Sequence, residues 1–253
     1  MKRLVIKVGT AVLTQDGELA YERMQNLVKL IATLKNEKNI DVILVSSGAV
    51  GAGYTSLKLD KSVLANKQTL AAIGQPKLMK TYQEMFEEFG ITVAQMLFIA
   101  DDFDSRKRSK NAKNVMEILL KNKVLPIINE NDVISTEELI GDNDQLAAYV
   151  THYFKADMLS ILTDIDGYYN KNPREFNDAK ILKVVNEISE EELNKKPTAN
   201  SKFATGGIVT KLKAADFLMQ KNIPMYLTSG FDLKNAYEFL VDNIHISGTI
   251  FKK

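Results

Sequence analysis

Apolar residues recur along the chain in two kinds of segment, one of strand length and one with helical spacing. Short apolar runs occupy residues 4–8, 42–45, 93–99, 124–128, 159–162 and 225–227. Segments of helical period lie between most of these runs, and the clearest has its apolar face at Met24, Leu27, Val28, Ile31 and Leu34. Alternating strands and helices predict right-handed crossovers and a mostly parallel sheet covered on both faces. The predicted fold class is therefore α/β.

The region after the fifth apolar run departs from this alternation. Residues 167–188 contain two tyrosines, a proline and a charged stretch before a β-rich run at 181–185, which predicts an antiparallel excursion or flap. Ser189, followed three residues later by Glu192, predicts a capping box at the start of a short helix. Residues 195–207 are polar and end in two glycines, a composition typical of a mobile loop.

Composition limits the classes of function. The 253 residues, 45% of them hydrophobic, can bury a core as one large α/β domain or two closely joined lobes. A net charge of +1 favours neither nucleic acid nor an anionic membrane as a partner. The absence of cysteine excludes disulfides, thiolate metal sites and a cysteine nucleophile, and it fits a cytoplasmic protein. No run approaches the roughly 18 apolar residues that a membrane helix needs.

Polar and small residues gather where the predicted strands end. Such residues occupy 7–10, 46–53, 129–132 and 163–167. In open parallel sheets, ligands bind outside the carboxyl ends of the strands, where helix N-termini point inward. We therefore expect the functional site at this edge of the sheet.

Lys7 is a charged residue inside an apolar strand. Burying an unpaired ammonium group is costly, so a buried Lys7 requires an anion, and phosphate is the natural candidate. A lysine that faces solvent from an edge strand would explain this position in the strand equally well. Gly9 shifts the balance toward a ligand, because glycine lets a bound group approach the backbone closely.

Two glycine-bearing turns are candidates for phosphate contact. Residues 47–53 (SGAVGAG) form a strand-to-helix turn that matches neither the dinucleotide fingerprint nor the P-loop, and a tight packing turn explains them equally well. Residues 205–211 (TGGIVTK) open a helix and place Lys211 close to its N-terminus. A cation is unfavourable there unless an anion is shared with the helix, which favours phosphate contact over a solvated lysine.

The segment Gly141 to Asp144 carries more polar groups than helix capping requires, and Asn129, Asn131 and Asp132 lie shortly upstream. Carboxylates and carboxamides at this density can bind an ammonium group and orient lysines. We expect Asp144 to hold Lys7 and Lys211 in place. His152 and His245 have no nearby ligand set, which argues against a histidine metal site, and the basic run 106–110 is more typical of a solvated helix face than of a nucleic-acid site.

The ordered motifs IKVGTAVLT, VSSGAVGAG, AAIGQ, PIINENDVIST, GDNDQLAA, LTDIDGYYNKNPR, ATGGIVTKLKAA and SGTIF resemble those of the glutamate 5-kinases, within the amino acid kinase family, over essentially the whole chain. The resemblance implies a three-layer αβα sandwich, ATP with Mg²⁺, and L-glutamate as the acceptor. It also implies L-glutamyl 5-phosphate as the product, in the first step of proline biosynthesis.

The resemblance also implies roles for residues at matching positions. The expected catalytic residues are Lys7, Lys211 and the organising Asp144, and the expected glutamate-binding residues are Ser47, Gly48, Asp132 and Asn143. The expected ATP-binding residues are Lys7, Gly9, Thr163, Asp164, Thr205, Gly206, Gly207, Ile208, Val209, Thr210 and Lys211. No protein ligand to the metal is expected, because Mg²⁺ is held mainly by nucleotide oxygens and water.

Three departures from the family pattern stand out. Many members carry a second, carboxy-terminal PUA domain, and we expect a kinase domain alone here, with an acceptor lobe near 1–155 and a nucleotide lobe near 156–253. Ala11 stands where a serine is common, and Asn172 stands where an aspartate is usual, so neither supplies the family's hydroxyl or carboxylate.

The resemblance extends to partners. It implies a homo-oligomer (dimer or tetramer), feedback inhibition by L-proline, and a handoff of the labile product to a glutamyl-phosphate reductase. Two alternatives stay open: a related kinase that acts on aspartate, N-acetylglutamate, carbamate or UMP, and a non-catalytic ligand-sensing relative.

Overall fold

The computed structural model describes residues 1–99, 101–135, 143–173, 175–194 and 206–253. Its centre is an eight-stranded sheet in the order β5-β6-β4-β1-β7-β9-β10-β8. The strands are β1 (Arg3–Val8), β4 (Asp41–Ser46), β5 (Val93–Phe98), β6 (Leu125–Glu130), β7 (Met158–Thr163), β8 (Val184–Val185), β9 (Met225–Ser229) and β10 (Thr249–Phe251). A separate hairpin joins β2 (Thr14–Gln15) to β3 (Glu18–Leu19).

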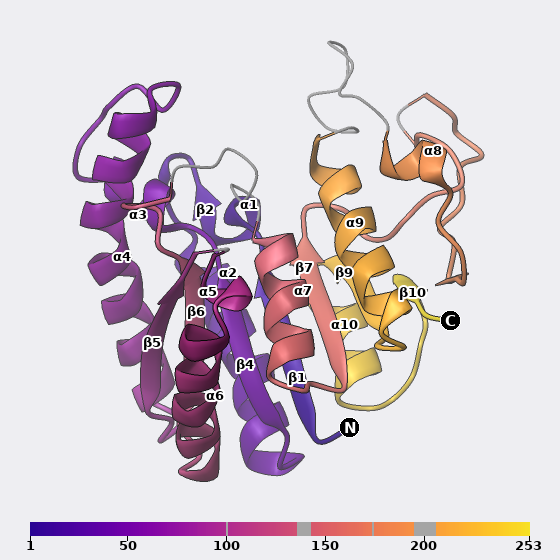
Figure 1. Cartoon of the computed structure of the whole chain (residues 1–253). Helices are drawn as coiled ribbons and strands as arrows, with labels where there is room; N and C mark the ends of the chain where they lie inside the picture. The colour runs from indigo at the N-terminus through magenta and orange to yellow at the C-terminus, as the bar shows by residue number, and fades with distance from the viewer. Residues whose placement is uncertain (100, 136–142, 174, 195–205) are drawn as a thin grey trace.

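Helices cover both faces of the sheet (Figure 1). The longer ones are α2 (Tyr21–Ala32), α4 (Leu64–Glu87), α6 (Arg106–Lys121), α7 (Asp144–Tyr153), α9 (Gly206–Gln220) and α10 (Lys234–Leu240). The shorter ones are α1 (Thr10–Leu13), α3 (Ala49–Tyr54), α5 (Asp101–Asp104) and α8 (Glu190–Leu193), and a π-helical segment, η1 (Thr33–Glu37), extends α2. The expected α/β class and three-layer αβα sandwich are confirmed.

Strand periodicity sorts the buried side chains into two cores. On β1, Leu4, Ile6 and Val8 face the core formed with α2, α4 and α10, whereas Val5 faces the core formed with α6, α7 and α9. Successive side chains of a strand point to opposite faces. Lys7 therefore shares the face of Val5 and points toward the layer that contains α7 and α9.

The sheet is parallel from β5 through β9, as the alternation of elements predicted. β10 runs antiparallel to β9, and β8 runs parallel to β10. The described residues of 167–188, which omit 174, contribute only β8 and one antiparallel bridge between Tyr169 and Ile181, so this part of the excursion carries little regular structure. The capping box predicted at Ser189 and Glu192 is present at the start of α8.

Several expectations concern parts of the chain that the structure does not describe. The proposed mobile loop at 195–207 falls outside the described residues except for Gly206 and Gly207. Gly141, Asp142 and Thr205 also lie outside the described residues. The division into two lobes near residue 155 stays a prediction.

 The described part of the chain contains no helix long and apolar enough to cross a membrane.

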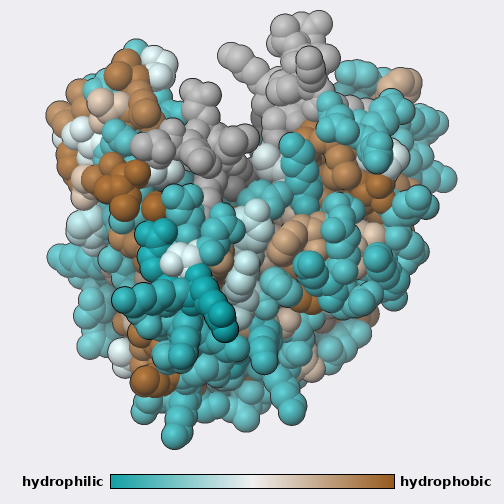
Figure 2. All heavy atoms as spheres, viewed as in Figure 1, coloured by the Kyte–Doolittle hydropathy of each residue, from teal (hydrophilic) through white to brown (hydrophobic). Residues whose placement is uncertain are grey.

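The face built by α6, α7 and α9 is mostly hydrophilic (Figure 2). The basic run at the start of α6 lies on this surface, with Arg106, Lys107, Arg108 and Lys110 exposed. Arg108 Nε lies 3.2 Å from Asp102 Oδ1. These contacts fit the solvated helix face that the sequence favoured.

Candidate active site

The carboxyl ends of the central parallel strands meet at one edge of the sheet. At this edge β1, β4, β6 and β7 end in Val8, Ser46, Glu130 and Thr163. The helices α1, α3, α7 and α9 begin on the same side (Figure 1). Parallel pairing with right-handed crossovers enforces this arrangement, and it brings the polar strand ends together.

A buried cluster of two lysines and one aspartate lies at this edge. Lys7 Nζ is 2.6 Å from Asp144 Oδ1, and Lys211 Nζ is 3.0 Å from Asp144 Oδ2. The side chains of Lys7, Lys211 and Asp144 are only 3%, 6% and 0% exposed. The solvent-facing alternatives for both lysines are therefore wrong.

Three separate elements build this cluster. Lys7 comes from the middle layer, Asp144 is the first residue of α7, and Lys211 lies in the second turn of α9. Lys211 Nζ also donates to the carbonyl oxygen of Gly207 at 2.9 Å, and Thr210 Oγ1 lies 3.1 Å from Asp144 Oδ2. An aspartate at a helix N-terminus is itself favoured by the helix dipole. Asp144 thus positions two ammonium groups that no single element could bring together.

Gly9 and the end of β7 lie beside this cluster. A Cβ atom built on Gly9 would be 3.9 Å from both Lys7 Nζ and Thr163 Oγ1. The backbone N–H of Gly9 donates to the carbonyl oxygen of Leu162 at 3.0 Å, and Thr163 Oγ1 donates to Asp164 Oδ1 at 2.9 Å. Position 9 therefore places no side chain beside the amine of Lys7 and the hydroxyl of Thr163.

The predicted ATP-binding loop is described only from Gly206 onward. Gly206, Gly207, Ile208, Val209 and Thr210 form the first turns of α9. A Cβ atom on Gly207 would lie 3.9 Å from Lys211 Nζ. Ile208 packs against the core that the sheet forms with α6, α7 and α9, and Val209 is buried. Their side chains serve packing, so any nucleotide contact at those two positions falls to the backbone.

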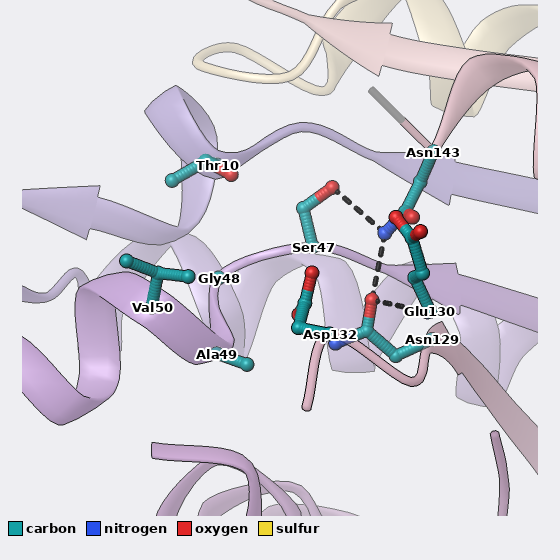
Figure 3. A pocket seen from close by; sticks show the side chains of 9 residues that line it. All are labelled: Thr10, Ser47, Gly48, Ala49, Val50, Asn129, Glu130, Asp132 and Asn143. Carbon is teal, nitrogen blue, oxygen red and sulfur yellow. Dashed lines mark hydrogen bonds between the residues drawn. The ribbon is translucent and has the colours of Figure 1, made fainter. Parts of the chain in front are cut away.

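A cavity lies at the same edge of the sheet, and its lining includes Asn143, the residue directly before Asp144 (Figure 3). Its lining residues are Thr10, Ser47, Gly48, Ala49, Val50, Asn129, Glu130, Asp132 and Asn143. The four residues predicted to bind the acceptor are therefore brought to one place. Asn129, from the polar cluster expected to bind an ammonium group, also lines it, as do Thr10 and Glu130, for which the sequence predicted no role of their own. Their position at strand ends was the signal that pointed to them.

The side-chain amide of Asn143 has a defined orientation in this cavity. Its Nδ2 donates to the carbonyl oxygen of Ser46 at 3.2 Å, and it also contacts Ser47 Oγ at 3.2 Å and Asn129 Oδ1 at 2.7 Å. A backbone carbonyl can only accept, so the nitrogen must face Ser46. Oδ1 is then the group that Asn143 can offer to a ligand.

Burial raises the pKa of Asp132 to about 6, and the nearby charge of Lys67 opposes this shift. Desolvation disfavours a carboxylate unless a cation or hydrogen-bond donor accompanies it. Together with Glu130 and Asn143 Oδ1, Asp132 gives the cavity a set of oxygen acceptors. Such a set suits an ammonium group.

The glycines of the turn after β4 serve two different purposes. Gly48 lines the cavity and has φ +102°, a conformation that L side chains rarely adopt. Gly53 and Gly74 instead let α3 and α4 touch backbone to backbone. A Cβ atom would lie 1.9 Å from the carbonyl oxygen of Leu70 at Gly53, and 1.8 Å from that of Ala49 at Gly74. The packing interpretation of this turn therefore holds for Gly53.

No group of three His, Cys, Asp or Glu side chains placed to hold a metal occurs among the residues that the structure describes. His152 packs edge-on against Phe217, His245 packs against Phe239, and neither histidine lines the cavity.

Comparison with known proteins agrees with this fold and site. The sequence profile of the amino acid kinase family matches residues 2–229. The chain belongs to the amino acid kinase family. It is 56% identical to glutamate 5-kinase from Wolinella succinogenes, over 99% of this chain and 98% of that protein. It is also 52% identical to glutamate 5-kinase from Leishmania donovani, over 99% of this chain and 95% of that one. The resemblance inferred from the motifs is thereby confirmed.

Other relatives are longer than this chain. Glutamate 5-kinase from Caldanaerobacter subterraneus subsp. tengcongensis is 46% identical over 90% of this chain, a match that covers 62% of that protein.

Solved structures share the fold at low identity. Carbamate kinase from Giardia lamblia bound to AMP-PNP superposes with a TM-score of 0.68 at 17% identity, over 100% of this chain and 99% of that one. An isopentenyl phosphate kinase product complex from T. acidophilum gives a TM-score of 0.66 at 15% identity, over 98% and 99% of the two chains.

Proposed function

We propose that this protein is an ATP-dependent kinase that phosphorylates the side-chain carboxylate of L-glutamate, with L-glutamyl 5-phosphate as the product. This reaction is the first step of proline biosynthesis. The observation that carries the proposal is the adjacency of two sites: the pair of buried lysines on Asp144 and the cavity lined by Ser47, Asp132 and Asn143. The high identity to glutamate 5-kinases over the whole chain supports the choice of acceptor.

In this proposal Lys7 and Lys211 contact the transferring phosphoryl group and offset the charge that develops on its oxygens. Asp144 holds the two ammonium groups at a set separation, so that little reorganisation is needed during transfer. The side-chain carboxylate of glutamate is ionised at neutral pH and is itself the nucleophile, so no strong general base is required. The protein's main task is to align the acceptor with the γ-phosphoryl group.

We propose one orientation of glutamate in the cavity, which the polar groups of its lining support. Asp132 and Asn143 Oδ1 accept hydrogen bonds from the α-ammonium group, while Ser47 and the backbone at Gly48 donate to a carboxylate. The remaining carboxylate then points toward Lys7. An acceptor without the ammonium group would leave Asp132 desolvated and unpaired, which is costly.

ATP is the expected co-substrate, held at Gly9, Thr163, Asp164 and the loop 205–211. Mg²⁺ would reduce the repulsion between the acceptor carboxylate and the phosphates, with nucleotide oxygens and water as its main ligands.

The decisive assay couples ATP consumption to trapping of the acyl phosphate with hydroxylamine. It is run with MgATP against glutamate, aspartate, N-acetylglutamate, carbamate and UMP. We expect hydroxamate with glutamate and little turnover with the other four. Turnover of a different acceptor would overturn the assignment of Ser47, Asp132 and Asn143. Silence with all five acceptors would instead favour a ligand-sensing role.

The acidity of Asp132 predicts a pH dependence. Its raised pKa of about 6 means that the carboxylate needed for the ammonium group becomes protonated as pH falls through 6. The KM for glutamate should therefore be constant above pH 7 and rise below pH 6, approaching tenfold per pH unit. The KM for MgATP serves as the internal control, because Asp132 lies outside the expected nucleotide site.

Asp132→Asn is the matched variant for this test. It should raise the KM for glutamate at pH 7.5 and remove most of its dependence on pH between 5 and 7. If Asp132→Asn keeps the full wild-type rise below pH 6, another group is responsible for it.

Further proposals concern regulation and assembly. L-proline carries an ammonium and a carboxylate group and would compete for the same cavity, so it should raise the KM for glutamate. A homo-oligomer, either dimer or tetramer, would be seen by sedimentation velocity. Direct transfer of the labile product to a glutamyl-phosphate reductase would protect it from hydrolysis. If adding the reductase does not speed the coupled two-enzyme reaction, this proposal is contradicted. We place the protein in the cytoplasm, where both substrates occur.

A further inference from the structure

A line of four side-chain amides runs from the acceptor cavity to the surface. Asn143 Nδ2 donates to Asn129 Oδ1 at 2.7 Å, Asn129 Nδ2 donates to Gln75 Oε1 at 2.9 Å, and Gln75 Nε2 donates to Gln95 Oε1 at 2.8 Å. Asn143 precedes the first residue of α7, and the other three residues come from β6, α4 and β5, elements that are far apart in the sequence. Each amide donates to the next in the same direction.

Backbone groups determine the direction of this line at the cavity end. The N–H of Glu130 donates to Asn129 Oδ1 at 2.9 Å, so that atom must be the oxygen. The carbonyl of Ser46 accepts from Asn143 Nδ2, so that atom must be the nitrogen. Figure 3 shows the nitrogen of Asn143 turned toward Ser47 and Asn129.

The nitrogen of Asn129 then needs an acceptor on its other side. Asn129 is only 3% exposed, so water cannot readily replace a lost partner, and a buried unsatisfied N–H is costly. Gln75 Oε1 is the acceptor that the structure provides. Gln75 itself is held in place because the adjacent Gly74 packs directly on the backbone of α3.

The geometry points to Gln75, on α4 and outside the lining of the cavity, as a positioning residue that keeps Asn143 Oδ1 directed at the substrate's ammonium group. This inference rests on the proposed function. Without an acceptor at position 75, the buried amide nitrogen of Asn129 is left unsatisfied, and Asn129 can regain a partner only by moving away from its place beside the cavity. Asn143 Nδ2 would then lose its shortest hydrogen bond, the one to Asn129 Oδ1, and the amide of Asn143 would no longer be held firmly with Oδ1 toward the ligand.

The test compares Gln75→Met with Gln75→Glu. Methionine keeps the length of the side chain and its helix propensity but removes the acceptor, whereas glutamate retains it. We expect Gln75→Met to raise the KM for glutamate about tenfold, with kcat and the KM for MgATP within twofold of wild type. Gln75→Glu should stay within about threefold of wild type in all three constants.

Glutarate separates recognition of the ammonium group from general damage to the cavity. It is glutamate without the α-ammonium group, so its inhibition constant against glutamate should change less than twofold in Gln75→Met. The preference for glutamate over glutarate should therefore fall about tenfold. Gln95→Ala, at the exposed end of the line, should behave as wild type because water can replace its oxygen.

Three results would overturn the inference: an unchanged KM for glutamate in Gln75→Met, equal impairment in Gln75→Met and Gln75→Glu, or parallel weakening of glutamate and glutarate. If Gln75→Met does not purify folded, Gln75→Lys, which can only donate, carries the same test and the same criteria. A wild-type protein that fails to phosphorylate glutamate would refute the proposed function, and that result is separate from any behaviour of these variants.

Discussion

Replacing Lys211 by methionine is expected to lower kcat by about 10²- to 10³-fold, the usual loss when one preorganised donor to a developing charge is removed. Lys7→Met should have an effect of the same size. Each variant leaves Asp144 with one lysine partner, so the aspartate is not stranded without a cation. The measurement is hydroxamate formation at saturating glutamate and MgATP, with thermal unfolding to confirm that the variants are folded.

Lys213→Met is the matched control for this pair, because it lies on the same helix two residues after Lys211 and is exposed. It should retain wild-type kcat. A folded Lys7→Met or Lys211→Met variant with near wild-type kcat would contradict the two-lysine mechanism. A loss confined to KM would instead indicate that the lysines bind the ground state and the transition state equally.

Gly74→Ala is expected to destabilise the protein by about 3 kcal/mol or more, since its methyl group would lie 1.8 Å from a backbone oxygen of α3 and 2.4 Å from a backbone nitrogen. Neither group can move without shifting the whole helix. For a chain of this size the loss corresponds to a fall of about 6–12 °C in Tm. The surviving folded protein should also have a raised KM for glutamate, because α3 carries the turn at Gly48.

Gly90→Ala is the control that distinguishes steric overlap with a neighbouring helix from strain of the backbone. A Cβ atom there meets nothing within 4 Å, but φ is +67°, so only the cost of a left-handed conformation applies, about 1 kcal/mol. Calorimetric scans of both variants give the comparison. If Gly74→Ala is no less stable than Gly90→Ala, the close contact of α3 and α4 is not a major source of stability.

Much of the fold was predictable because its signals are local. Apolar runs of strand length marked six of the strands, and the spacing of Met24, Leu27 and Val28 marked α2. Short-range features were also recognised, among them the capping box at Ser189 and Glu192. The strands β2 and β3 were harder to predict, since two residues of pairing leave almost no pattern, whereas β8 lies inside the β-rich run expected at 181–185.

The candidate site was predictable in part. A charged residue inside an apolar strand pointed to Lys7, because burial of such a group is costly without a partner. The polar residues after one predicted strand and before one predicted helix pointed to Asp132 and Asn143, and the family resemblance implied their role as acceptor-binding residues. The same reasoning did not single out Gln75, which sits on a helix and has no unusual neighbours in the sequence. Its importance depends on a hydrogen bond to Asn129, 54 residues away.

The sequence by itself determined the alternation of strands and helices, the parallel sheet and the edge at which chemistry gathers, because periodicity and chain crossover follow from local sterics and burial. It also supplied the ordered motifs that mark the family. Only the tertiary structure decided that Lys7 faces the layer of α7 and α9 rather than solvent, and that Asp144 joins it to Lys211. It alone also decided that the amide of Asn143 turns its oxygen to the cavity. These outcomes depend on which distant elements pack together, and that is set by the burial of the whole core rather than by any one segment.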